Sequence, residues 1–160
     1  MMMPRTHVLI GFCVAAVINL FLPLAWWHFL LAGFVAAIID LDHVINFWRV
    51  KGELSVQKAW NTAFEHLGFE RSFLHRKYGI LFFMVVSSFI MIFSPVSGVI
   101  VFCAALSHWL FDHTYFRKAH ERLVKVGHWL YPISFEELTL DMVFIFLSLV
   151  FLMLNNHVAV

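Results

Sequence analysis

Charged side chains are scarce in this chain. Asp, Glu, Lys and Arg make up 13% of its 160 residues, whereas 62% are hydrophobic. Soluble domains carry about 25% charged residues, so the composition is typical of an integral membrane protein. The formal net charge is only +1. A balance so close to zero argues against a nucleic-acid-binding protein, which needs a basic surface.

Cysteine, glycine and proline are also few. Cys13 and Cys103 both fall inside apolar runs and lack the spacing of a metal or disulfide motif. Cysteine in such surroundings is typically a small buried apolar residue, which excludes a disulfide framework and a cysteine zinc site. The chain has no internal repeat and no linker rich in Gly, Pro or Ser. We therefore expect one domain over residues 1–160.

Long apolar runs dominate the chain. Each is 16 or 17 residues long, near the short end of what spans the hydrocarbon layer. The first run follows Met1–Arg5 and is directly succeeded by a second, which indicates a retained helix rather than a secretory signal. The sequence predicts an all-α integral membrane bundle of about five transmembrane helices. The predicted spans are His7–Leu22, Leu24–Ile39, Tyr78–Phe93, Val96–Phe111 and Leu138–Leu154.

All eleven Lys and Arg residues lie outside these runs. If the chain crosses the membrane five times, residues 22–24, 94–95 and 155–160 share one side and carry no charged side chain. The N-terminus and residues 40–77 and 112–137 share the other. Cytoplasmic loops are the ones enriched in Lys and Arg. We therefore expect an inner-membrane protein with a cytoplasmic N-terminus and its C-terminus on the opposite side.

Two segments on the cytoplasmic side have helical periodicity. Ser55–Gly68 and about Tyr115–Leu130 each place apolar residues on one face and polar residues on the other. They are predicted to be amphipathic helices at the membrane surface, the second attracted to anionic lipid, although both faces fit packing on the bundle equally well. Ser134 and Glu137 form a capping box before the fifth span, which gives Glu137 a structural role.

Histidine and aspartate gather at the predicted span ends on that same side. His108 and Asp112 are four residues apart, so on a helix they can point to one atom. Asp40 and His43, three apart, can do the same if the second helix continues that far. The topology brings four such segments to one level of the membrane. The candidate metal ligands are His7, Asp40, Asp42, His43, His75, His108 and Asp112.

Asp and His suit zinc, with manganese or iron as alternatives. Two carboxylates at Asp40 and Asp42 also need a positive partner at the membrane edge, which either a divalent ion or Arg76 would supply. Each residue alone has a plainer interpretation, because a His or Asp at a helix end commonly faces the interface. The convergence of four segments favours a metal or acid–base site.

The order His, Asp-x-Asp-His, His-Arg, His-x-x-x-Asp resembles the YdjM-like membrane-bound metal-dependent hydrolases, a family similar at fold level to zinc-dependent phospholipase C and single-strand zinc nucleases. The resemblance covers roughly His7–Asp112. It implies that the candidate ligands hold metal or support it and that Arg76 contacts a phosphate. The chain departs from the family pattern His-Arg-Gly-x-Thr-His-Ser, because Ile80 stands where the second His is expected.

The leading hypothesis is a metal-dependent phosphoester hydrolase. A divalent ion lowers the pKa of a bound water to about 7, and Asp40 or Asp42 would take the proton as general base. Arg76 would hold a phosphoryl oxygen, with Lys77 adding positive charge. The expected depth of the site makes a lipid phosphoester the natural substrate, and membrane lipids the expected partners.

A catalytically silent metal-binding scaffold or sensor is the alternative, and the missing second His favours it. A haem or quinone carrier fits less well, since the histidines crowd at one edge among carboxylates. A transporter also fits less well, because no span is visibly broken near its middle.

Overall fold

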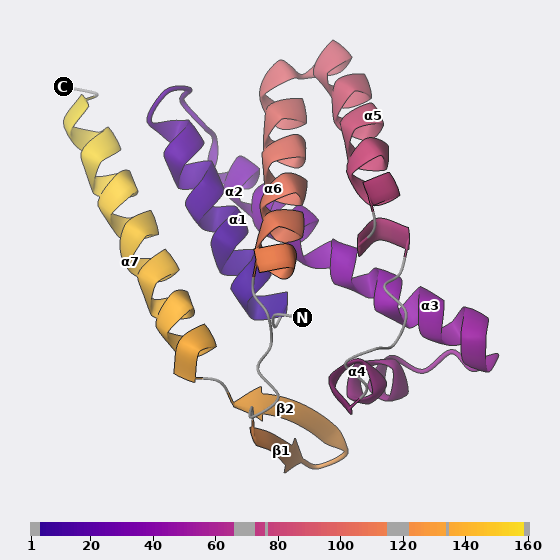
Figure 1. The fold of residues 1–160 in the computed structure, drawn as a ribbon. Helices are drawn as coiled ribbons and strands as arrows, with labels where there is room; N and C mark the ends of the chain where they lie inside the picture. Colours follow the sequence, from indigo (N-terminus) through magenta and orange to yellow (C-terminus); the bar gives the residue numbers. More distant parts are fainter. Residues whose placement is uncertain (1–3, 66–72, 76, 115–121, 134, 159–160) are drawn as a thin grey trace.

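The computed structural model describes residues 4–65, 73–75, 77–114, 122–133 and 135–158. Five apolar helices form a bundle, and two shorter helices and a β-hairpin lie at one end of it (Figure 1). The all-α bundle predicted from the apolar runs is thereby confirmed. The helices are α1 (Pro4–Asn19), α2 (Trp26–Ile38), α3 (Asp42–Lys51), α4 (Val56–Glu65), α5 (Lys77–Phe93), α6 (Pro95–Thr114) and α7 (Phe135–Val158), the 3-10 helices are η1 (Ile39–Leu41) and η2 (Phe73–His75), and the strands are β1 (Arg122–Val126) and β2 (Trp129–Ile133).

Helix α1 lies at the centre of the bundle. It packs against α2, α6 and α7, while α6 also packs against α2 and α5. Small side chains let these helices approach closely: a Cβ on Gly11 of α1 would lie 2.5 Å from the carbonyl oxygen of Ala32 on α2. Close approach through small residues is typical of helices packed in a membrane. The buried core between α1, α2 and α6 consists of Ala15, Ala32, Val35, Ala36, Ile39, Ile100, Val101, Ala104 and Ala105.

Within the described residues, three helical segments are long and apolar enough to cross a membrane: Trp26–Lys51, Pro95–Asp112 and Phe135–Asn155. The shorter apolar helices Pro4–Asn19 and Tyr78–Phe93 complete the bundle. The connections alternate between its two ends, as Figure 1 shows. The α1–α2 loop, the α5–α6 turn and the C-terminus lie at one end, and the N-terminus, α3, α4 and the hairpin lie at the other.

The second predicted span does not stop at Ile39. Helix α2 passes through η1 into α3 without a loop, so the rod ends only at Gly52, which has φ +71° and donates its N–H to the carbonyl of Trp48 at 2.7 Å. Glycine tolerates this left-handed conformation and is the usual residue just past a helix end. Asp40 and Asp42 therefore lie within a continuous helical rod, which fixes their positions relative to α2.

The helix predicted within Ser55–Gly68 is confirmed. The helix predicted over about Tyr115–Leu130 is wrong where the structure describes that segment, and residues 115–121 lie outside the described residues. Helix α4 begins after Ser55, whose Oγ accepts a hydrogen bond from the N–H of Lys58 at 3.3 Å. Gly68, the expected end, is outside the described residues. Within Tyr115–Leu130, however, residues 122–126 form β1, which pairs antiparallel with β2 and places Val126 opposite Trp129.

The hairpin has a local cause. Valine and aromatic residues favour strands, and Gly127 adopts φ +61° in the two-residue turn. The turn is tied to α4, because the carbonyl of His128 accepts hydrogen bonds from Gln57 Nε2 at 2.8 Å and Asn61 Nδ2 at 2.9 Å.

Candidate metal centre

Side chains from four segments meet at the end of the bundle that carries the hairpin. His7 comes from the first turn of α1, Asp40 from η1, His75 from η2, and His108 and Asp112 from the last turns of α6. All five are buried or nearly so, with His7 fully buried and His108 1% exposed. The fold thus brings together residues up to 105 positions apart in the sequence (7 and 112).

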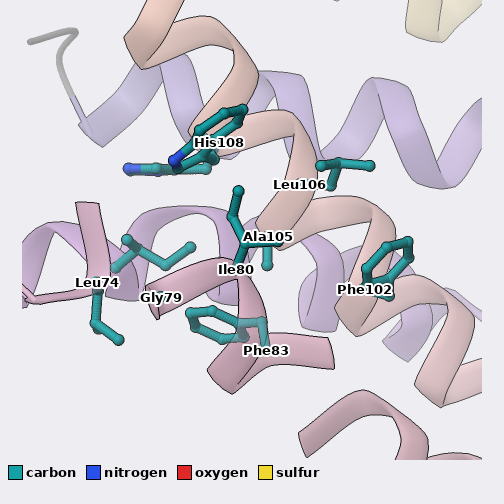
Figure 2. Close-up of a pocket in the computed structure, with 10 residues that line it drawn as sticks. Leu74, Gly79, Ile80, Phe83, Phe102, Ala105, Leu106 and His108 are labelled. Atoms are coloured by element: carbon teal, nitrogen blue, oxygen red, sulfur yellow. The ribbon is translucent and has the colours of Figure 1, made fainter. Parts of the chain in front are cut away.

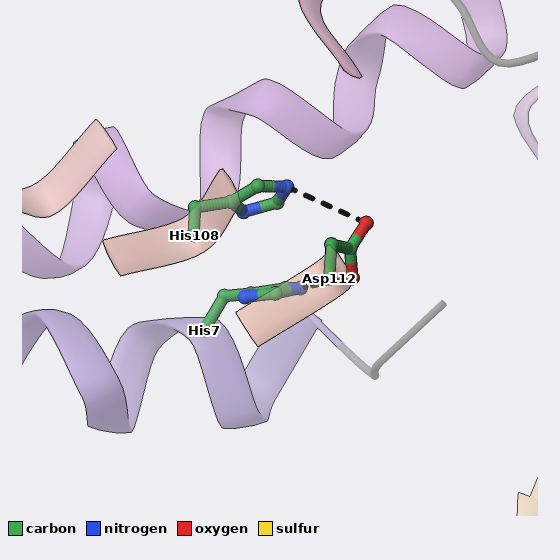
Figure 3. Close-up of side chains that lie close together, drawn as sticks. All are labelled: His7, His108 and Asp112. Atoms are coloured by element: carbon green, nitrogen blue, oxygen red, sulfur yellow. Dashed lines mark ion pairs between the residues drawn. The ribbon is translucent and has the colours of Figure 1, made fainter. Parts of the chain in front are cut away.

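Two groups of described residues could hold a metal ion. His7, His108 and Asp112 form the first, since one possible ligand atom from each lies within 4.8 Å of the others. Figure 3 shows the two imidazole rings stacked beside the carboxylate. The ring centroids are 3.8 Å apart, and His7 Nε2 lies 3.4 Å from Asp112 Oδ1. His108 Nε2 lies 3.9 Å from Asp112 Oδ2, as the four-residue spacing predicts.

Asp40, His75 and His108 form the second group. Oδ1 of Asp40 lies 3.6 Å from His75 Nε2 and 3.7 Å from His108 Nε2. The two Nε2 atoms are 3.1 Å apart, and His75 Nε2 is also 3.3 Å from Asp112 Oδ2. The two groups therefore share His108, and its Nε2 faces both carboxylates.

The orientation of His108 is fixed by helix α2. Its Nδ1 lies 2.6 Å from the carbonyl oxygen of Ala36, which can only accept, so Nδ1 carries the proton and donates. This tautomer leaves Nε2 of His108 unprotonated, so its lone pair can accept a hydrogen bond from His75 Nε2, 3.1 Å away, or bind a cation in its place. Histidine ligands of metals are commonly held this way, with the second ring nitrogen donating to a backbone carbonyl.

Asp42 and His43 support His75. Asp42 Oδ2 accepts a hydrogen bond from the N–H of Leu74 at 2.6 Å and lies 3.9 Å from His75 Nδ1. The His43 ring stands 4.5 Å from the His75 ring. Gly79 lets η2 approach α5, because a Cβ there would collide with the carbonyl of Leu74. These contacts hold η2 against the helical rod and aim His75 at the cluster.

The cluster holds polar atoms whose hydrogen-bonding capacity is unmet. Both ring nitrogens of His7, both carboxylate oxygens of Asp40 and Nε2 of His43 are buried and make no hydrogen bond to any part of the chain that the structure describes. Burial lowers the pKa of His75, but its contacts with the carboxylates of Asp112, Asp40 and Asp42 outweigh burial and raise the pKa to about 11. Three carboxylates so arranged favour a positive charge, and the donor set suits a divalent cation.

The structure brings together all seven candidate ligands, although their roles as ligands stay predictions. Arg76 lies outside the described residues, and the side chain of Lys77 is likewise not described. Ile80, in place of the family's second His, lines an apolar pocket that His108 also lines (Figure 2).

A second buried polar cluster, not predicted from the sequence, joins α1 to α7. Thr6 Oγ1 lies 2.9 Å from Glu137 Oε1 and 2.6 Å from Asp141 Oδ1, and Arg5 Nε lies 3.1 Å from Asp141 Oδ2. Asp141 lies inside the fifth apolar run, four residues after Glu137, so both face one side of α7. The position of Asp141 inside an apolar run could have predicted this cluster, because an acidic residue within a membrane span needs a partner. The partner of Glu137 expected in the capping box, Ser134, lies outside the described residues.

The comparisons with known proteins give one match. The family model described as YdjM inner membrane protein matches residues 2–159. Neither the curated proteins nor the solved structures contain a match.

Proposed function

Because the chain belongs to the YdjM inner membrane protein family, as the order of its His and Asp residues indicated, we propose that it is a membrane-embedded, metal-dependent hydrolase. The observation that carries the proposal is the pair of buried His/Asp groups that share His108 and could each hold a metal ion. Zinc is the proposed ion, because imidazole nitrogen and carboxylate oxygen are ligands of catalytic zinc.

The contacts of the His and Asp residues indicate which would bind the ion and which would act as general base. His108 Nε2 would bind the ion together with His7 and Asp112, with His75 and Asp40, or with both pairs. A divalent ion held there supplies Lewis acidity and a water of lowered pKa. Asp42 already accepts the N–H of Leu74, whereas both oxygens of Asp40 are without a hydrogen bond within the described chain. Asp40 is therefore the better candidate for the general base.

A lipid phosphoester is the proposed substrate, and it would be hydrolysed at the cytoplasmic face. The support is the position of the cluster at one end of a bundle of apolar helices. Arg76 and Lys77 directly follow His75 in the sequence and would supply positive charge for the phosphate. The proposed orientation has five crossings and a cytoplasmic N-terminus. A reporter enzyme that is active only outside the cytoplasm should then be active when it is fused to the C-terminus.

Metal content of the detergent-purified protein tests the centre. We expect about one or two equivalents of zinc by mass spectrometry, lost in His108→Ala and in Asp112→Ala but kept in His128→Ala. His128 is the matched control, because its side chain is exposed on the hairpin. Zinc-loaded protein should then release phosphate from phosphatidic acid in mixed micelles. Equal zinc content in all four proteins would refute the centre, and zinc without turnover of any phosphoester would refute the hydrolase.

Ile80 favours a second candidate, a catalytically silent metal-binding scaffold or sensor. It places an apolar wall beside His108 where the family pattern has a further His. This reading predicts that chelation lowers the melting temperature while the protein turns over no phosphoester with or without zinc. Restored turnover in Ile80→His would identify the missing imidazole as the cause.

A further inference from the structure

A seam between α5 and α6 leads away from the metal centre. The part nearest the metal centre is an apolar pocket in which Ile80 and Phe83 of α5 lie near Ala105 and Phe102 of α6, with His108 at one end (Figure 2). His108 therefore contacts both sites: its Nε2 faces the carboxylates of the metal centre, and its ring lines the apolar pocket. The pocket therefore extends to a candidate metal ligand.

The seam widens farther from the metal centre. A second cavity of about 200 Å³ lies between the same two helices and shares Phe102 with the first. The hydroxyl of Ser87 donates to the carbonyl of Met84 at 3.0 Å, so it does not present a free donor to the cavity. The cavity is lined by Met84, Ser87, Ser88, Met91 and Phe102.

The two cavities lie along one helix face. Ile80, Met84, Ser88 and Met91 follow one another at spacings of three and four residues, so they form a single stripe on α5. At 1.5 Å per residue the stripe is about 16 Å long. Met84 and Ser88 are exposed, so this part of the seam opens to the outside of the bundle, on a helix whose other faces are apolar.

We propose that the α5–α6 seam holds one hydrocarbon chain of the lipid whose headgroup lies at the metal centre. The proposal rests on the proposed function, because it takes that headgroup to be the phosphoester substrate. The chain would enter sideways from the bilayer between Met84 and Ser88 and run along the stripe toward His108, and it would thereby place the headgroup against the His/Asp cluster.

The lining argues for a chain rather than for a polypeptide. Free space beside His108 is only about 10 Å³. A helix cannot enter it, because a helix with side chains is about 10 Å across. Only a thin occupant can use that space, and it must displace flexible side chains to do so. The Met side chains at the wide end are unbranched and adapt readily to such an occupant. Hydrocarbon also needs no hydrogen-bonding partner, which suits a wide end lined mainly by the thioether, methylene and phenyl groups of Met84, Met91 and Phe102, beside the two serines.

Photocrosslinking tests where the chain lies. The probe is phosphatidic acid with a diazirine near the end of one acyl chain, incorporated into nanodiscs of phosphatidylethanolamine and phosphatidylglycerol. We expect adducts to concentrate on Met91 and Phe102, at least fivefold above those on Phe89, which is 62% exposed on the outer surface of α5. Ser88→Trp should fill the wide end and remove the seam adducts. Val85→Trp is the matched control on the same helix, since Val85 is 64% exposed and does not line the seam.

Adducts spread evenly over Phe89 and the seam, or unchanged in Ser88→Trp, would overturn the proposal, because they would show only lipid surrounding the protein. Turnover separates this failure from failure of the proposed function. Ser88→Trp should lower kcat/KM at least tenfold for long-chain phosphatidic acid, with zinc content and turnover of a water-soluble short-chain phosphatidic acid unchanged. Seam adducts on a protein that hydrolyses neither lipid would refute the hydrolase but keep the chain site. Turnover without seam adducts would refute the chain site but keep the hydrolase.

Discussion

Substituting His108 gives the sharpest test of the metal centre, because both candidate ligand groups contain this residue. His108→Gln keeps a polar side chain of similar length but removes the imidazole, and with it the Nε2 lone pair that faces Asp40 and Asp112. Loss of a group that only orients a metal ligand lowers affinity by about 10- to 100-fold. Loss of the shared ligand itself should reach at least the upper end of that range, about 2.7 kcal/mol.

Zinc-dependent melting in detergent converts this affinity into a measurable shift. At free zinc about 100-fold above its dissociation constant, binding stabilises the native protein by about 2.7 kcal/mol, or roughly 5–11 °C for a chain of this size. The same zinc concentration would stabilise His108→Gln by about 0.4 kcal/mol, which is a shift of less than about 2 °C. The control His128→Gln should shift as the parent does. An undiminished zinc shift in His108→Gln would refute the shared-ligand arrangement.

Three further predictions follow from other contacts. Thr6→Val removes the hydroxyl that lies 2.6 Å from Asp141 and should lower the unfolding free energy by about 1.5–3 kcal/mol in denaturant titrations, with Thr6→Ser as the conservative control. Gly79→Ala should weaken zinc binding in competition titrations, because its Cβ would push the carbonyl of Leu74 and the adjoining His75 away from the cluster; unchanged affinity would contradict that role. The raised pKa of His75, about 11, means that zinc must displace a proton from it. Its apparent affinity should therefore rise about tenfold per pH unit between pH 6 and 8, and a flat pH profile would exclude His75 as a ligand.

The bundle was predictable because its signal is long and local. Each of the five apolar runs corresponds to a helix, and the helical stripe after Ser55 corresponds to α4. The error over Tyr115–Leu130 arose because spacing alone decided between helix and strand. Val124, Val126 and Trp129 favour a strand, and Gly127 permits the tight turn, but these signals span only a few residues.

The members of the candidate site were predictable for a different reason. The helix connections alternate between the two ends of the bundle (Figure 1), so the order of the apolar runs alone predicts which run ends meet, and with them which His and Asp residues lie at one level. It could not divide them into roles. That Nε2 of His108 serves two groups while Nδ1 is held by Ala36 depends on ring orientation, and that Asp42 accepts the N–H of Leu74 depends on how η2 folds back. Both are set by packing between distant segments.

The second polar cluster physically connects α7 to the candidate metal centre. Thr6 directly precedes His7 on α1, and its hydroxyl lies between the carboxylates of Glu137 and Asp141 on α7. Two buried carboxylates among apolar helices are stable only with partners, which Thr6 and Arg5 supply from the same turn of α1. The first turn of α1 therefore faces two ways: it anchors α7 through one pair of side chains and presents His7 to α6 through the next residue. Any shift of α7 along α1 must break these contacts or move His7. Helix α7, which supplies none of the candidate ligands, therefore helps to fix the position of one of them.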